Sequence, residues 1–209
     1  MTNLITLFVQ GGILMYPLLL TSIVTLVLIS ERCAFWWKIY RRQEELVQKV
    51  LILYKEDIKQ AIAKLEENID LPIARIFLSA IHLESPNIDE FNLALEGAVH
   101  SEIPTLKRFH NILDTIITLS PLMGLLGTVT GLMTSFANIR VGEITGEKAS
   151  AVSGGISEAL ITTATGLIIA IIATVFANIF RSLYQRQMAF IQEYATQLEL
   201  YFRRYHANS

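Results

Sequence analysis

Hydroxyl and carboxyl side chains interrupt two strongly apolar stretches of the chain, residues 115–137 and 156–180. Glu158 is the only carboxylate of the later stretch. A carboxylate inside a membrane is typical of a proton or cation site, and a threonine hydroxyl can donate and accept hydrogen bonds. The alternative for Glu158 is a glutamate at the membrane surface that reaches water. The candidate ion-pathway residues are Thr128, Glu158, Thr162, Thr163 and Thr165.

The small residues of both stretches fall on one side of a helix. Steps of three and four residues join Gly124, Thr128, Gly131, Ser135 and Asn138, and a matching sector of the later stretch holds Thr163, Gly166, Ala170, Thr174 and Ala177. Small residues allow two membrane helices to pack closely, whereas hydroxyls could also line a polar path. Both interpretations stay open. The residues predicted to pack or to line a pore are Pro121, Gly124, Gly127, Gly131, Ser135, Gly166 and Ala170.

The composition is that of a membrane protein. Apolar residues make up 52% of the 209-residue chain, charged residues only 17%, and the net charge of −2 gives no reason to expect nucleic-acid binding. A single cysteine and four scattered histidines form no metal-binding motif, so we expect no cofactor. No nucleophile–base pair or phosphate-binding loop is visible, and we therefore do not expect an enzyme.

Three apolar segments are long enough to cross a bilayer. The first, residues 13–30, would be about 27 Å long as a helix. The pattern between and beyond the spans indicates helix throughout, with no strand-like alternation. The predicted segments are an N-terminal segment at 1–12, membrane helices at 13–30, 115–137 and 156–180, a helical domain at 31–114, a short loop at 138–155 and a C-terminal helix at 181–209.

Details of the helical domain are also predicted. We expect the first helix to continue past Trp36 and Trp37, and a capping box formed by Asp57 and Gln60 to start another. A helix that starts near residue 89 is expected to continue into the second span, bent at two prolines. The tail carries an apolar 3.5-residue repeat from Tyr184 to Tyr205, which packs either within the subunit or between subunits.

The charge distribution predicts the orientation. Eleven of the 17 Lys and Arg residues lie in 31–113 and four follow residue 180, whereas the first 30 residues have none. The positive-inside rule then places the N-terminus and the short loop outside and the helical domain and tail in the cytoplasm.

Three motifs resemble those of the ExbB/TolQ/MotA family of bacterial proton-channel proteins, with a size and layout similar to ExbB and TolQ. They are Gly11-Gly12-x-x-Met15-Tyr16-Pro17-Leu18, Ser120-Pro121-Leu-Met-Gly-Leu-Leu-Gly-Thr128-Val-x-Gly and Ile156-Ser-Glu158-Ala-Leu-Ile-Thr-Thr163-Ala-x-Gly166-Leu. Ser120 stands where the family usually has alanine.

The resemblance implies an all-α homopentamer around a pore in the bacterial inner membrane, where the proton motive force would drive transport or envelope work. It also implies an ExbD/TolR-like one-span partner, present as a dimer, whose aspartate would face Thr128 and Thr163, and a TonB- or TolA-like protein beyond it. The extra hydroxyls of Thr162 and Thr165 leave H⁺ and Na⁺ both open. A non-conducting scaffold is the main alternative, and a substrate transporter would need more spans.

Overall fold

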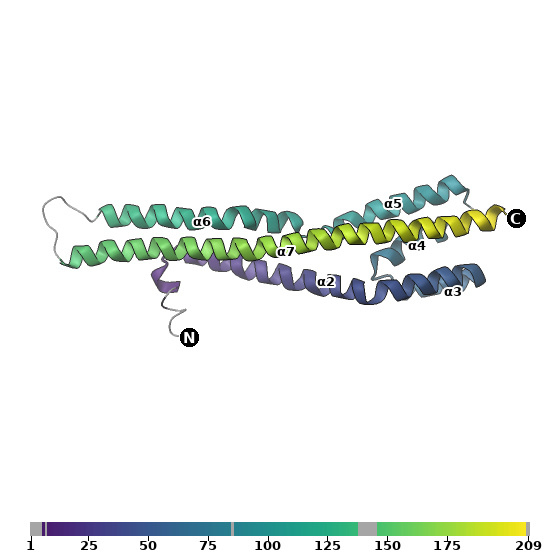
Figure 1. Ribbon diagram of the computed structural model, residues 1–209, viewed down its shortest axis with the longest axis horizontal. Coiled ribbons are helices and arrows are strands. Elements are labelled where there is room, and N and C mark those ends of the chain that lie inside the picture. The colour runs from purple at the N-terminus through teal and green to yellow at the C-terminus, as the bar shows by residue number, and fades with distance from the viewer. Residues whose placement is uncertain (1–5, 7, 85, 138–145, 208–209) are drawn as a thin grey trace. The chain divides into compact units, whose positions relative to one another are not determined.

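The computed structural model describes residues 6, 8–84, 86–137 and 146–207, and in these residues the regular structure is entirely helical (Figure 1). Three helical stretches are long and apolar enough to span a membrane, which confirms the predicted all-α fold with three spans. The helices are α2 (Met15–Glu56), α3 (Ile58–Glu66), α4 (Pro72–Ile81), α5 (Ile88–Leu106), α6 (His110–Ala137) and α7 (Gly146–Ala207).

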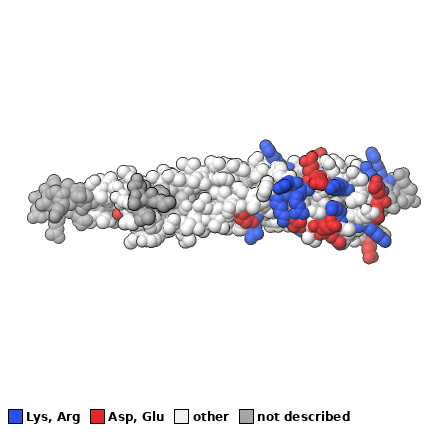
Figure 2. All heavy atoms as spheres, turned by 90° about the horizontal axis from the view of Figure 1, so that it is seen from below, with Lys and Arg blue, Asp and Glu red and all other residues white. Residues whose placement is uncertain are grey.

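The chain forms two compact units. The membrane unit consists of Met1–Glu31 and Phe109–Ile179, and the charged unit consists of Arg32–Arg108 and Phe180–Ser209. Figure 2 shows that Lys, Arg, Asp and Glu gather on the charged unit, whereas the described surface of the membrane unit is almost free of them on the face drawn. This division agrees with the charge pattern of the sequence.

Helix α2 starts at a glycine turn. Gly12 adopts a φ of +66°, in the left-handed region that favours glycine, and the helix begins at Met15, two residues after the start of the predicted span. Pro17 lies in the first turn, where a missing N–H costs nothing. The helix continues for 42 residues through Trp36 and Trp37, as predicted.

Two predictions about the helices are wrong. The helix that was expected to run from residue 89 through the second span is interrupted, because Phe109 adopts a φ of 68° and separates α5 from α6. Pro104 and Pro121 lie inside these helices. The loop predicted at 138–155 is also too long, because α7 already begins at Gly146 and residues 138–145 lie outside the described chain.

The charged unit has its own apolar core. Phe91 of α5 stacks on Phe202 of α7 with ring centroids 4.1 Å apart, and Ile191 and Leu198 of the tail are fully buried. The tail repeat therefore packs within its own subunit over these residues; Tyr205 lies where no side chain is described. Asp57 caps α3 through the N–H groups of Lys59 and Gln60.

Ion pairs hold the turn between α3 and α4 against its neighbours. Asp70 in that turn pairs with Lys38 at 2.8 Å and with Arg42 at 2.7 Å, both from α2. Arg75 of α4 donates two hydrogen bonds of 2.6 Å to the carboxylate of Glu102 on α5. Glu102 raises the pKa of Arg75 above its ordinary value, so the Arg75 guanidinium stays charged.

Candidate ion pathway

The backbones of α6 and α7 touch along a glycine seam, formed by Gly124, Gly127 and Gly131 of α6 and Gly155 and Gly166 of α7. A Cβ atom on Gly124 would lie 2.9 Å from the Cα atom of Thr163, and one on Gly131 would lie 2.8 Å from the carbonyl oxygen of Gly155. The contacts pair rising residue numbers on α6 with falling numbers on α7, so the two helices are antiparallel. The glycines are therefore required for close packing.

The seam also explains the error in the predicted loop. Gly155 packs against Gly131 and against the side chain of Ser135, so its lack of a Cβ serves a helix contact instead of a turn. From sequence, Ser-Gly and Gly-Gly pairs are typical of turns and loops. Only the facing helix distinguishes the two roles.

The buried stripe of α6 differs from the predicted stripe by one residue. Gly127 is buried at the seam, whereas Thr128 lies beside it and is half-buried. Asn138, the last member of the predicted stripe, lies outside the described residues. The buried small residues of α6 are Ser120, Gly124, Gly127, Gly131 and Ser135.

Thr163 joins the two helices through its side chain. Its hydroxyl donates a 2.8 Å hydrogen bond to the carbonyl oxygen of Gly124. Thr128 follows Gly124 by four residues and therefore lies one turn further along the same side of α6. Its hydroxyl donates to the carbonyl oxygen of Leu125 at 2.7 Å. The two half-buried threonines are thus neighbours at the edge of the seam.

Thr162 lies inside the seam and not at its edge. Its side chain is fully buried, packs against Gly127, and donates to the carbonyl oxygen of Ala159 at 2.9 Å. Within this subunit Thr162 therefore acts as a packing residue.

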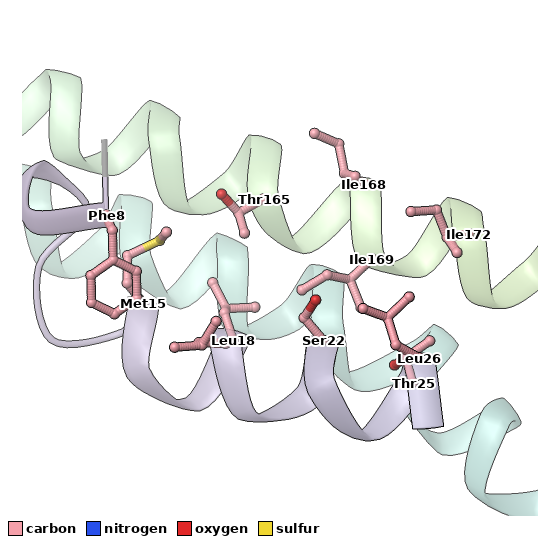
Figure 3. Close-up of a pocket in the computed structure, with 11 residues that line it drawn as sticks. Phe8, Met15, Leu18, Ser22, Thr25, Leu26, Thr165, Ile168, Ile169 and Ile172 are labelled. Atoms are coloured by element: carbon pink, nitrogen blue, oxygen red, sulfur yellow. The ribbon is translucent and has the colours of Figure 1, made fainter. Parts of the chain in front are cut away.

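Thr165 lies on another side of α7. It lines a groove between α2 and α7, together with Ser22 and Thr25 (Figure 3). Its hydroxyl donates to the carbonyl oxygen of Ile161 at 2.8 Å. The candidate ion-pathway residues Glu158, Thr162 and Thr165 are therefore divided among three environments.

Glu158 contacts the start of α2. It is half-buried, and its carboxylate packs so closely on Gly12 that a side chain at that position would collide with it. Its backbone carbonyl oxygen accepts a hydrogen bond of 3.2 Å from the Thr162 hydroxyl, but its carboxylate forms no hydrogen bond or ion pair with any described residue. The side chain lies about 7.5 Å along the helix axis from Thr163, at 1.5 Å per residue.

The remaining predicted residues are structural in this subunit. Ala170 is buried, Gly166 packs against the carbonyl oxygen of Ser120, and Pro121 lies half-buried inside α6. Ser120, noted from the sequence only as a serine in place of the family's usual alanine, has a fully buried side chain whose hydroxyl has no hydrogen-bond partner within the described chain. Among the described residues, no three His, Cys, Asp or Glu side chains could hold a metal ion.

Fold and site together define a three-span helical membrane protein with hydroxyl side chains at the edge of its closely packed second and third spans. Residues 68–193 match the MotA/TolQ/ExbB proton channel family, and the chain belongs to this family. The resemblance found in the three motifs is thereby confirmed. Thr128, Glu158 and Thr163 all lie within the matched region.

The relatives are ExbB proteins and ExbB-like proteins. The chain is 54% identical to biopolymer transport protein ExbB-like 3 of Synechocystis sp., over 94% of this chain and 93% of that protein. It is 38% identical to ExbB-like 1 of the same organism, over 94% of this chain and 78% of that protein. It is 47% identical to biopolymer transport protein ExbB of Salmonella typhimurium, over 35% of this chain and 29% of that protein.

Proposed function

We propose that this chain is the channel-forming subunit of an inner-membrane motor that uses the proton motive force for biopolymer transport or envelope work. Membership of a proton channel family and similarity to proteins named for biopolymer transport support this role. The structural observation that carries the proposal is the position of two half-buried threonines at the glycine seam: Thr163 bonds to the carbonyl oxygen of Gly124, and Thr128 lies one helical turn from Gly124.

The hydroxyls suit a partner that delivers protons. Both threonines use their hydrogen atoms on backbone carbonyl oxygens, so each hydroxyl oxygen keeps lone pairs to accept a hydrogen bond. A protonated aspartate has one O–H donor, and an ionised one has none. An aspartate on a partner helix would therefore bind the threonines when protonated and leave when ionised, which couples proton transfer to movement.

The partner in this proposal is a dimer of an ExbD/TolR-like one-span protein inside a homopentamer of this chain, with a TonB- or TolA-like protein beyond it. The seam supports an inner ring built from α6–α7 pairs, because the backbone contact keeps each pair rigid. Glu158, near the outer end of the predicted third span, would admit the ion. The ion is H⁺ with Na⁺ as the alternative, and no other cofactor is needed.

The proposed orientation follows the charges. The charged unit would lie in the cytoplasm, because it contains the Lys and Arg residues next to the first span, and the N-terminus would lie in the periplasm. Trp37 and Tyr40 are exposed just after the C-terminal end of the first span, as expected for a lipid–water interface.

Proton flux tests the proposal against the scaffold alternative. Vesicles that contain this chain and a one-span partner with a transmembrane aspartate should acidify under an applied potential. Vesicles with either protein alone, or with the partner aspartate changed to asparagine, should not. A complex that assembles normally but conducts nothing would identify a scaffold.

A further inference from the structure

A groove of about 200 Å³ runs between α2 and α7 within the membrane unit (Figure 3). Helix α2 contributes Leu18, Ser22 and Leu26, and α7 contributes Thr165, Ile168 and Ile172. Phe8 closes one end and contacts the ring of Tyr16 edge-on at 5.3 Å. Unlike the glycine seam, this side of α7 is left unfilled by the subunit itself.

The rim of the groove is exposed. Leu26 and Ile168, from opposite sides, expose 59% and 58% of their surfaces. Because both helices belong to candidate membrane spans, these side chains lie at the depth of the hydrocarbon region of the bilayer. The groove therefore opens away from the subunit at that depth.

The groove offers little to water. The hydroxyls of Thr25 and Thr165 donate to carbonyl oxygens of their own helices, at 2.7 and 2.8 Å. The hydroxyl of Ser22 forms no hydrogen bond with any described residue, and the other lining side chains are apolar. A buried water needs two to four polar partners, whereas apolar cavities of about 150 Å³ bind hydrocarbons such as benzene.

The length of the groove fits one occupant. From Met15 to Leu26 the helix rises about 16 Å, which is half of a hydrocarbon core about 30 Å thick. That is the depth reached by the acyl chains of one leaflet. A protein helix, about 10 Å wide, is too large for the volume.

We propose that the groove between α2 and α7 binds one acyl chain of a phospholipid from the leaflet nearest the N-terminal end of α2. The chain would pack between Leu18 and Ile168 and cover the hydroxyl of Thr165. Thr165 thus belongs to a lipid site and not to the ion pathway at the α6–α7 edge. The inference does not depend on whether the protein conducts ions.

Photolabelling of the full chain tests the site. The protein is reconstituted in phosphatidylethanolamine–phosphatidylglycerol vesicles with a trace of phospholipid whose acyl chain carries a diazirine, and adducts are mapped by mass spectrometry after irradiation. We expect several-fold more adduct at Ser22, Thr165 and Ile169 than at Ile23 and Ile171. The last two residues lie on the same helices, outside the groove, and are 51% and 62% exposed.

Variants that fill the groove test the site further, beside a matched control. Ser22→Phe should reduce labelling of Thr165 several-fold, and Ile23→Phe, an equal change one residue away, should not. Ile168→Trp fills the groove from the other helix and should repeat the effect if Ser22→Phe fails to fold. Equal labelling of groove and control residues would overturn the proposal, and so would adducts that join two copies of the chain in place of lipid.

Discussion

The hydroxyl of Thr163 on α7 donates a hydrogen bond to the carbonyl oxygen of Gly124 on α6, over 2.8 Å. This contact exists only because Gly124 lacks a side chain, so that the backbone of α6 approaches within reach of Thr163. The helix contact and the placement of the hydroxyl thus have one cause. Interhelical hydrogen bonds in membranes average about 0.6 kcal/mol, so the glycine contacts and not this bond dominate the packing.

Adding one methyl group to the seam should separate α6 from α7. In Gly166→Ala the new Cβ would meet the carbonyl oxygen of Ser120, a backbone atom that cannot move by rotation. Overpacking of this kind costs about 1–3 kcal/mol, so we expect a lower unfolding temperature in detergent. Gly154→Ala is the control on the same helix, because no atom beyond the local backbone of its own helix lies within 4 Å of its Cβ position. It should unfold at the same or a higher temperature, and equal losses in both variants would refute the seam.

Changes at Glu158 should separate its charge from its packing. Glu158→Gln keeps the shape that packs on Gly12, whereas Glu158→Leu also removes the polar group. We expect Glu158→Gln to disturb assembly less than Glu158→Leu and both variants to lose gradient-driven work. Size-exclusion chromatography and a flux assay give the two readouts. Wild-type activity in both variants would make Glu158 a surface glutamate without a role in transport.

The charged unit should lose stability in acid through Asp70. Partial burial raises the pKa of the Asp70 carboxyl, but the hydrogen bonds and charges of Lys38 and Arg42 outweigh this effect and hold the pKa below its ordinary value. A lowered folded-state pKa stabilises the protein above the unfolded pKa of about 3.9, and this gain disappears as the pH falls through the folded value.

Asp70→Asn should therefore cost about 0.2–1 kcal/mol near neutral pH and progressively less below about pH 4. Thermal unfolding of the two proteins across this range measures the difference. Glu84→Gln is the control, since this exposed carboxylate forms no ion pair with the described residues. A constant Asp70→Asn difference at every pH would show that the ion pairs do not contribute.

Native mass spectrometry of the complex should find five copies of this chain with two copies of the partner. Ten helices with axes about 9 Å apart form a ring of about 15 Å radius, which leaves a lumen of about 19 Å for two helices of about 10 Å. Four copies would leave only about 14 Å, and a count of four or six would contradict the geometry. Since two partner helices cannot match five-fold symmetry, we expect rotation, and a crosslink that fixes the partner to one subunit should abolish activity.

Regular periodicity made most of the fold predictable from sequence. The spans follow from apolar runs, and the long continuation of α2 after Pro17 and of α7 after Gly166 follows from the lack of glycine and proline there. The breaks were harder, because Phe109 adopts a left-handed conformation with no glycine to signal it. The capping box predicted at Asp57 is incomplete, because one of its two hydrogen bonds is replaced by others. The N–H of Asp57 is already bonded to Leu53, so the Gln60 side chain donates to the Asp57 carboxylate instead.

The site was predictable only in its residue types. The sequence analysis grouped Thr162 and Thr165 as candidate ion-pathway residues, but the helices that pack against α7, α6 and α2, decide what each residue contacts. Gly127 admits Thr162 into the seam, and α2 leaves Thr165 beside a groove. The predicted stripe contained Thr128, whereas the buried stripe contains Gly127. The difference arises because a helical wheel does not show which of two adjacent residues faces the partner helix.

A proton-flux measurement tests the proposed pathway most directly. The vesicles contain this chain with its one-span partner, and the variants Thr163→Ser and Thr163→Val are compared. Serine keeps the hydroxyl and its hydrogen bond to Gly124, whereas valine keeps the volume and removes both. We predict wild-type assembly for both variants, near-normal flux for Thr163→Ser and at least about a tenfold loss for Thr163→Val, which corresponds to about 1.4 kcal/mol. Undiminished flux through assembled Thr163→Val complexes would contradict the account and leave Thr163 a packing residue.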